Sequence, residues 1–183
     1  EAEIRPEALP LTRAANSATD RVAPDPGPVI DAIAAYGGTD LLCYRAEEPL
    51  GLVRRQSAAW TPWLDWSGRV LGAPLLAVVG VMHHPQPAES LARLRAHVAA
   101  CDAFELTALH DLVSLSGSLV LGLAVSRGAL APEAAWDLSR IDEAWQAEQW
   151  GEDAEAAHQA GRRRADFLRA EHLLQLLTRQ ADI

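Results

Sequence analysis

A chain of 183 residues is long enough to build one well-packed domain, and 49% hydrophobic with 22% charged residues is the composition of a globular protein. The formal net charge is −9, from 16 basic and 25 acidic side chains, and a field of that sign repels phosphate backbones. These values exclude a disordered chain and argue against a nucleic-acid partner.

Apolar runs and cysteines indicate the compartment. Runs such as residues 119–125 are far shorter than the roughly 20 residues that a membrane-spanning helix needs, so no membrane insertion is expected. Cys43 and Cys101 each lie in an apolar run, which favours buried free thiols in a reducing environment. A composition with Arg but no Lys, and with few cysteines, favours a protein of the bacterial cytoplasm. If the protein is eukaryotic, we expect the mitochondrial matrix.

The first part of the chain predicts short helices and one strand. Apolar residues at helical spacing predict a helix over residues 9–22, which the Pro-rich run 24–28 ends. We expect residues 1–28 to form a connecting helix and loop, and residues 29–183 to form a mainly helical domain. A short helix over residues 29–36 stops at a Gly-Gly pair, and TDLLCYR at residues 39–45 is the best strand candidate.

The rest of the chain is helical apart from a second strand. Residues 49–72 have a helical pattern, but Thr61 followed by Pro62 has the form of a helix start, so a break or kink is expected there. The valine-rich run 75–82 predicts a buried strand that pairs with residues 39–45. Helices are expected over residues 88–100, 103–115, 118–127, 132–150 and 152–178. The predicted fold class is mainly α, a helical bundle with a small two-stranded β element.

Motifs for catalysis or metal binding are not found. His97, Cys101 and Glu105 recur every four residues, but structural zinc sites usually take their ligands from turns and loops, so no metal is expected. His110 and Asp111 with nearby serines lack a nucleophile elbow, and we expect these two neighbours to face apart on a helix. The common cofactor motifs are absent, so we predict neither a cofactor nor enzymatic activity.

Six tryptophans form two clusters in the sequence. Large exposed aromatic side chains are enriched in binding hot spots, whereas buried ones fill the core between helices, and both interpretations stay open here. The first cluster is Trp60, Trp63 and Trp66, and the second is Trp136, Trp145 and Trp150.

The run IDEAWQAEQWGED at residues 141–153 closely resembles the signature of the assembly chaperones that bind the unassembled α subunit of the F-type ATP synthase. Three further blocks agree in order and spacing: PLTRAANSATDRV at residues 10–22, TDLLCYR with its downstream Gln56, Trp60, Pro62 and Trp66, and GSLVLGLAV at residues 117–125. Members of that family carry a small β-rich domain before the first block, and the resemblance implies that this domain is missing here or was not included.

The resemblance implies a protein that holds the free α subunit and shields the surfaces meant for the β subunit, without catalysing a reaction. We expect the partner-binding residues to be those that match the C-terminal signature: Asp142, Glu143, Gln146, Trp150, Gly151, Glu152 and Asp153. A second set, which matches the earlier blocks, is expected to be structural or binding: Asp40, Tyr44, Arg45, Gln56, Trp60 and Trp66.

Two alternative functions remain at this point. One is a small-molecule enzyme with an unrecognised helical pocket, in which carboxylates such as Asp142 and Glu143 would face a cleft. The other is a structural adaptor that stays in the finished complex. Within the signature, Gln146, Trp150 and Gly151 could also serve only to lock the last two helices together.

Overall fold

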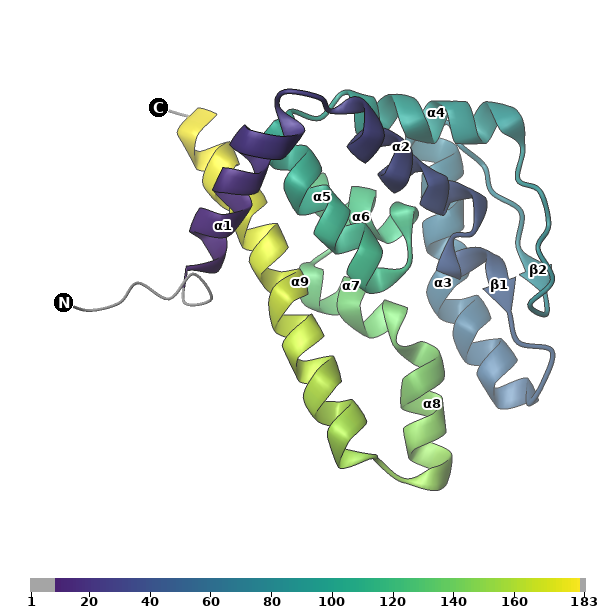
Figure 1. Cartoon of the computed structure of the whole chain (residues 1–183). Coiled ribbons are helices and arrows are strands. Elements are labelled where there is room, and N and C mark those ends of the chain that lie inside the picture. The colour runs from purple at the N-terminus through teal and green to yellow at the C-terminus, as the bar shows by residue number, and fades with distance from the viewer. Residues whose placement is uncertain (1–8, 182–183) are drawn as a thin grey trace.

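The computed structural model describes residues 9–181, with side chains through residue 178, and it is a helical bundle with one small sheet (Figure 1). The predicted mainly α class is therefore confirmed. In chain order the elements are α1 (Pro10–Ser17), the π-helical η2 (Ala18–Val22), α2 (Gly27–Ala35), the 3-10 turns η3 (Tyr36–Gly38) and η4 (Leu41–Cys43), β1 (Tyr44–Arg45), α3 (Leu50–Val70), β2 (Val78–Val79), α4 (Ala88–Ala99), α5 (Ala103–Ser116), α6 (Leu119–Ser126), α7 (Pro132–Ser139), α8 (Ile141–Trp150) and α9 (Ala154–Ala181).

The core is centred on α5 and α6. Residues 119–125 of α6 are all buried, as expected for a helix that is apolar on every side. Helix α5 packs against α6 and against the long α9, while α1 with η2 covers α5 at one end of the molecule (Figure 1). Helices α2, α4 and α3 close the other sides, so that α3, α8 and the sheet lie away from α1 (Figure 1). No helix among residues 9–181 is long and apolar enough to cross a membrane.

The two predicted strands pair, but both are much shorter than expected. Strands β1 and β2 run parallel, with Tyr44 opposite Val78 and Arg45 opposite Val79. Residues 41–43 turn instead of extending, because the Asp40 carboxylate accepts a hydrogen bond from the Leu42 N–H at 3.0 Å and caps a 3-10 turn. The prediction of a buried strand over residues 75–82 is wrong, since most of that run is exposed.

Of the break or kink predicted at Thr61, the break is wrong, because α3 runs continuously through Pro62. Its buried side chains lie on both sides of the proline and hold both halves of the helix on the core: Gln56, Trp60, Leu64 and Ser67. Pro62 is itself exposed, so the carbonyl that loses its helical partner can be solvated by water.

The helix predicted over residues 132–150 is two helices that meet at Arg140. The Leu138 carbonyl accepts a hydrogen bond from Trp60 Nε1 at 2.8 Å, and Ser139 Oγ donates to the Trp136 carbonyl at 2.7 Å. Because these side chains occupy carbonyls that a continuous helix would use, the chain turns and starts α8 in a new direction.

The suggested zinc residues do not share a helix. Helix α4 ends at Ala99, and α5 starts from a capping box in which Asp102 and Glu105 bond each other's backbone N–H groups. His97 contacts the Leu71 carbonyl through Nε2 at 3.0 Å. In the part of the chain that the structure describes, no group of three or more His, Cys, Asp or Glu residues is placed to hold a metal ion.

Candidate functional site

Helix α8 is fixed to the N-terminal half of α3 through Gln56. The Gln56 side chain is buried, with 1% of its surface exposed, and its Nε2 donates to Asp142 Oδ1 at 2.6 Å. Its Oε1 accepts from the Ala46 N–H at 2.7 Å, just after β1. One amide therefore joins the sheet, α3 and α8, and it brings together residues that lie 86 positions apart in the sequence.

Arg45 lies under the same junction. Its Nη1 donates to the Gln56 carbonyl at 2.6 Å, and its guanidinium lies over the Trp60 ring at 5.1 Å from the centroid. Burial lowers the pKa of the Arg45 guanidinium from its ordinary value. Among the described residues its Nη2 has no hydrogen-bond partner, so stacking on Trp60 supplies part of its stabilisation.

A second contact between the two helices lies nearer their exposed ends. Arg55 donates to both carboxylate oxygens of Glu148, at 2.7 and 2.8 Å, and its guanidinium lies 5.0 Å from the Trp145 ring centroid. The hydrogen bond from Arg55 lowers the pKa of Glu148. A Cβ atom on Gly51 would lie only 2.5 Å from Cη2 of Trp145, so a glycine is required for this approach.

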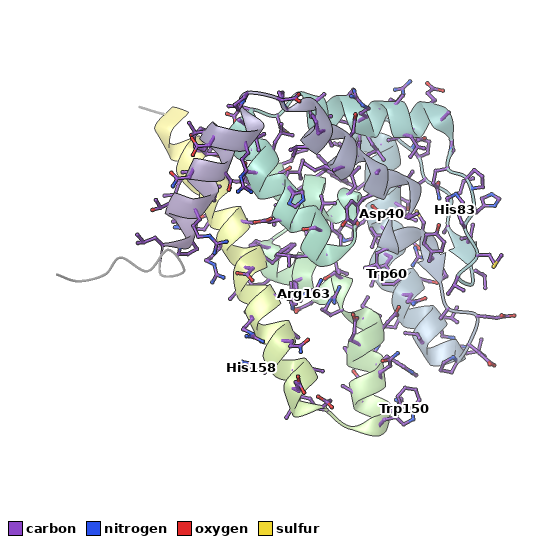
Figure 2. The ribbon with its side chains drawn as sticks, in the orientation of Figure 1. Asp40, Trp60, His83, Trp150, His158 and Arg163 are labelled. Carbon is purple, nitrogen blue, oxygen red and sulfur yellow. The ribbon has the colours of Figure 1, made fainter. Side chains whose placement is uncertain are left out.

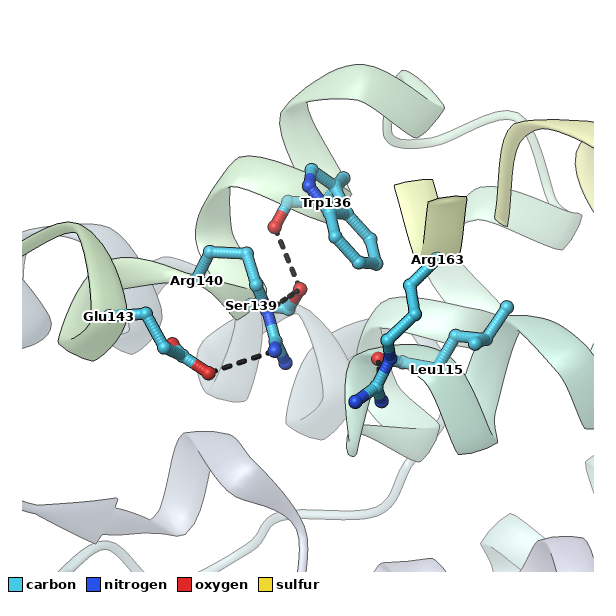
Figure 3. A network of polar contacts seen from close by, with 6 residues as sticks. All are labelled: Leu115, Trp136, Ser139, Arg140, Glu143 and Arg163. Carbon is cyan, nitrogen blue, oxygen red and sulfur yellow. Dashed lines mark hydrogen bonds and ion pairs between the residues drawn. The ribbon is translucent and has the colours of Figure 1, made fainter. Parts of the chain in front are cut away.

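Glu143 and Arg140 form a third contact at the start of α8 (Figure 3). Arg140 Nη1 donates to Glu143 Oε1 at 2.8 Å, and the guanidinium also lies 5.2 Å from the Trp136 ring centroid. Burial is the main cause that lowers the pKa of Arg140. Glu143 is thus held to the α7–α8 junction by its own neighbour in the sequence, and Arg163 from α9 reaches the Leu115 carbonyl close by.

The end of α8 projects from the bundle. Trp150 is 79% exposed and lies at the tip of the helix (Figure 2). Gly151 follows with φ 90° and ψ 161°, an extended conformation that glycine adopts far more easily than other residues. The neighbouring signature residues Gln146, Glu152 and Asp153 are also exposed, and Asp153 Oδ1 accepts from the Ala156 N–H at 2.8 Å at the start of α9.

Asp40 connects the first half of the chain to α6. Its carboxylate is fully buried and accepts hydrogen bonds from Ser118 Oγ at 2.8 Å and from the Val120 N–H at 3.0 Å, at the N-terminus of that helix. Burial raises the pKa of Asp40 to about 6, although these hydrogen bonds oppose the rise. The negative side chain therefore caps α6 from a distant segment.

The remaining residues of the second set are peripheral to this junction. Tyr44 is half-buried, and its hydroxyl lies 3.4 Å from His83 Nδ1. Trp66 is half-buried and packs edge-on against Trp63, with 6.1 Å between ring centroids. The structure thus joins Gln56 with α8 and Trp60 with α7, and Arg45 contacts both of these residues. Asp40 instead contacts α6, and Trp66 contacts its own helix.

Sequence reasoning missed Arg55 and Gly51 as parts of the site. Arg55 could not be matched with Glu148 from the sequence, because the two residues are 93 positions apart. Trp145 and Glu148 lay inside the recognised signature, and their spacing of three residues on a helix could have indicated one shared face toward α3.

A cavity of about 630 Å³ lies between α1, α5 and α9, away from Asp142 and Glu143. Its lining includes His110 and Asp111, whose side chains meet at 3.2 Å between Nδ1 and Oδ1, so the expectation that they face apart is wrong. The hydrogen bond that His110 donates to the Asp111 carboxylate raises the pKa of His110. Ser114 Oγ bonds the Asp111 carbonyl at 3.4 Å instead of the His110 ring, which is not the arrangement of an activated nucleophile.

This arrangement defines a class of protein. Asp142 and Glu148 of the signature tie α8 to α3, and Trp150 projects into solvent beside them. Exposed aromatic side chains on a fixed helix are typical of proteins that bind other proteins.

Comparisons with known proteins agree with that class. The family described as "ATP12 chaperone protein" matches residues 1–68. The crystal structure of Atp12 from Paracoccus denitrificans is 51% identical, with a TM-score of 0.93, and the match covers 96% of this chain and 76% of that chain. A mutant of the same Atp12p gives 50% identity and a TM-score of 0.93, covering 96% of this chain and 75% of that chain.

The Atu1473 protein of Agrobacterium tumefaciens is 42% identical, with a TM-score of 0.90, and the match covers 95% of this chain and 65% of that chain. The chain belongs to the ATP12 chaperone family. The protein is therefore an ATP synthase assembly chaperone, and the resemblance seen in its sequence is confirmed.

Proposed function

We propose that the protein binds the unassembled α subunit of the F-type ATP synthase through the exposed end of α8 and holds it until the β subunit takes its place. The observation that carries this proposal is Trp150, a large aromatic side chain left 79% exposed at the tip of a helix that two side-chain contacts fix to α3. A rigidly presented tryptophan is typical of a binding hot spot.

The charges around Trp150 indicate the kind of surface that it would meet. Gln146, Glu152 and Asp153 are exposed beside it, and none of these side chains pairs with an arginine in the described part of the chain. Carboxylates next to an aromatic ring suit a client segment that carries arginine together with apolar side chains. We place this action in the bacterial cytoplasm, where Cys43 and Cys101 can remain the free thiols seen here.

Asp142 and Glu143 contribute differently in this proposal. Asp142 bonds Gln56 and thereby holds α8 on α3, and Glu143 pairs with Arg140. Both residues therefore position the α8 surface. Each carboxylate uses one oxygen for this contact, and the other oxygen is left for the client. Holding needs no bond to be made or broken in the client, because covering an exposed apolar interface by itself suppresses aggregation.

Co-expression with a tagged α subunit tests the proposal. We expect α to be soluble and to co-purify only when the protein is present, and we expect added β subunit to release it. If β enters the complex and the protein stays, the adaptor function is correct; if α is insoluble with and without the protein, the proposed function fails.

A further inference from the structure

The segment from residue 70 to residue 88 contains no Asp, Glu, Lys or Arg, in a chain of which 22% is charged. After α3 ends at Val70, four large apolar side chains of this segment are exposed: Leu76 at 47%, Val79 at 66%, Val81 at 91% and Met82 at 82%. Exposed apolar residues gathered in one segment usually mark an interaction surface. We refer to residues 76–84 as the β2 edge loop.

The β2 edge loop is held at its base. The buried Gln86 side chain accepts from the Leu76 N–H at 2.8 Å and donates to the Leu76 carbonyl at 2.9 Å, as a neighbouring strand would. On the other side, the Gly80 N–H donates to the Arg45 carbonyl at 2.8 Å. These bonds fix where the loop leaves the molecule, so its apolar side chains are presented rather than free to fold back.

One edge of β2 is open. Within residues 9–181, β2 pairs only with β1. Because the Gly80 N–H faces β1 and alternate residues of a strand face opposite edges, the N–H and carbonyl of Val79 point away from β1. A cavity of about 310 Å³ lies between the β2 edge loop and the β1 side of the sheet, lined by Thr39, Tyr44, Val81 and His83, and it has room for a side chain.

The β2 edge loop is linked to α8 through the sheet and α3. Strand β2 pairs with β1, Arg45 of β1 donates to the Gln56 carbonyl, and the Gln56 side chain binds Asp142. Both ends of the described chain lie at the other end of the molecule, beside α1 and the end of α9 (Figure 1). His83 next to β2 and Trp150 at the tip of α8 both lie away from α1 (Figure 2).

We infer that the β2 edge loop is a second contact surface for the client, which takes an uncharged, extended apolar segment of the subunit as an added strand beside β2. The inference rests on the proposed function. An uncharged segment fits because residues 70–88 contain no Asp, Glu, Lys or Arg to pair with a charged one. A strand of two residues is too short to hold two copies of this chain together alone, but it adds affinity to a client already bound at α8.

The test is a pair of charges at the two most exposed positions, Val81→Asp with Met82→Asp, in the chain co-purified with tagged α subunit. We expect at least tenfold weaker binding of α with unchanged thermal unfolding, because an added strand would have to bury both charges. Val70→Asp, at a valine that is 54% exposed at the far end of α3, is the matched control and should bind α like the wild type. If the double aspartate variant unfolds, Val81→Ser with Met82→Ser replaces it and should also weaken binding.

Each other outcome is decisive. Unchanged binding by a folded double variant overturns the inference and leaves the proposed function standing. If the wild type does not retain α, both fail together. If the wild type forms dimers that the double variant loses, while binding of α is equal, the loop belongs to a second copy and the inference is wrong.

Discussion

Trp60 is the residue where three elements of the site meet. Its side chain is fully buried, its Nε1 bonds the Leu138 carbonyl at 2.8 Å, and its ring supports the Arg45 guanidinium. Trp150 has none of these contacts and is 79% exposed. The core interpretation therefore holds for Trp60, whereas Trp150 is exposed, as the proposed interface requires, and composition alone could not have separated the two.

We expect Trp60→Ala to lower the free energy of unfolding by about 3–5 kcal/mol, since it leaves a large cavity and an unpaired carbonyl in the core. Trp150→Ala is the matched control and should change stability by less than about 0.5 kcal/mol because its side chain is exposed. Chemical unfolding of both variants measures this. Normal stability of Trp60→Ala with lost binding of the α subunit would contradict the core role.

Asp40 predicts a pH dependence of stability. Its folded pKa of about 6 lies above the ordinary value of 3.8, so the folded state binds the proton more tightly than the unfolded chain. The stability that this group contributes is fully present below about pH 4 and is lost as the pH rises through about 6. A rise of roughly two pKa units corresponds to about 3 kcal/mol.

Asp40→Asn removes the titration and isolates this effect. The variant should be less stable than the wild type, because an amide offers one oxygen where Leu42, Ser118 and Val120 now use two. We expect the wild type to exceed the variant in free energy of unfolding at pH 4, and we expect this difference to narrow by up to about 3 kcal/mol at pH 7. Urea unfolding at both pH values measures it. A gap that stays constant over that range would show that Asp40 does not titrate there.

At the scale of elements, helix identity could be predicted from the sequence better than helix boundaries. The spacing of apolar residues and the positions of Pro and Gly predicted the ends of most helices to within a few residues of the observed ends. The errors at Thr61 and Arg140 both depend on tertiary contacts, in which buried side chains carry α3 past Pro62 and Trp60 takes a carbonyl at the α7–α8 turn. Local sequence contains neither contact.

The exposed β2 edge loop was mispredicted for a related reason. An apolar run between prolines has the composition of a buried strand, and nothing in the run itself shows that one edge and one face lack a neighbour. Of the candidate site, the sequence could supply the α8 signature through family resemblance, but not the partners of those residues. Only the folded structure shows that Gln56 contacts Asp142 and that Arg55 contacts Glu148.

Packing of α8 on α3 predicts opposite effects for two glycines of one helix. Gly51→Ala should destabilise the protein by about 1–3 kcal/mol, because its Cβ would lie 2.5 Å from Cη2 of Trp145 and push α8 away. Gly68→Ala meets only Pro74, at 3.6 Å, and should stabilise by about 0.5–1 kcal/mol. Thermal unfolding compares the two, and equal effects would contradict the close approach of the helices.

At the scale of the whole molecule, the packed interior is separate from the side on which we propose that the client binds. Helices α5 and α6 form the packed interior, and α9 packs along α5 with one side exposed. Helices α8 and α3 and the sheet form one connected layer that bears Trp150 and the β2 edge loop. An assembly chaperone has to bind its client firmly and later release it, so exposed contacts of limited size on a stable scaffold suit the task better than a deep pocket.

Affinity of the α subunit for Trp150→Ala, compared with the wild type, tests the central claim most directly. Truncation of a hot-spot tryptophan costs about 2 kcal/mol or more, so we predict a Kd raised roughly 30-fold or more with unchanged unfolding. The control is Val70→Ala at an exposed residue on the far end of α3, which should bind like the wild type. Equal affinity of Trp150→Ala and the wild type would contradict the account and move the client away from the end of α8.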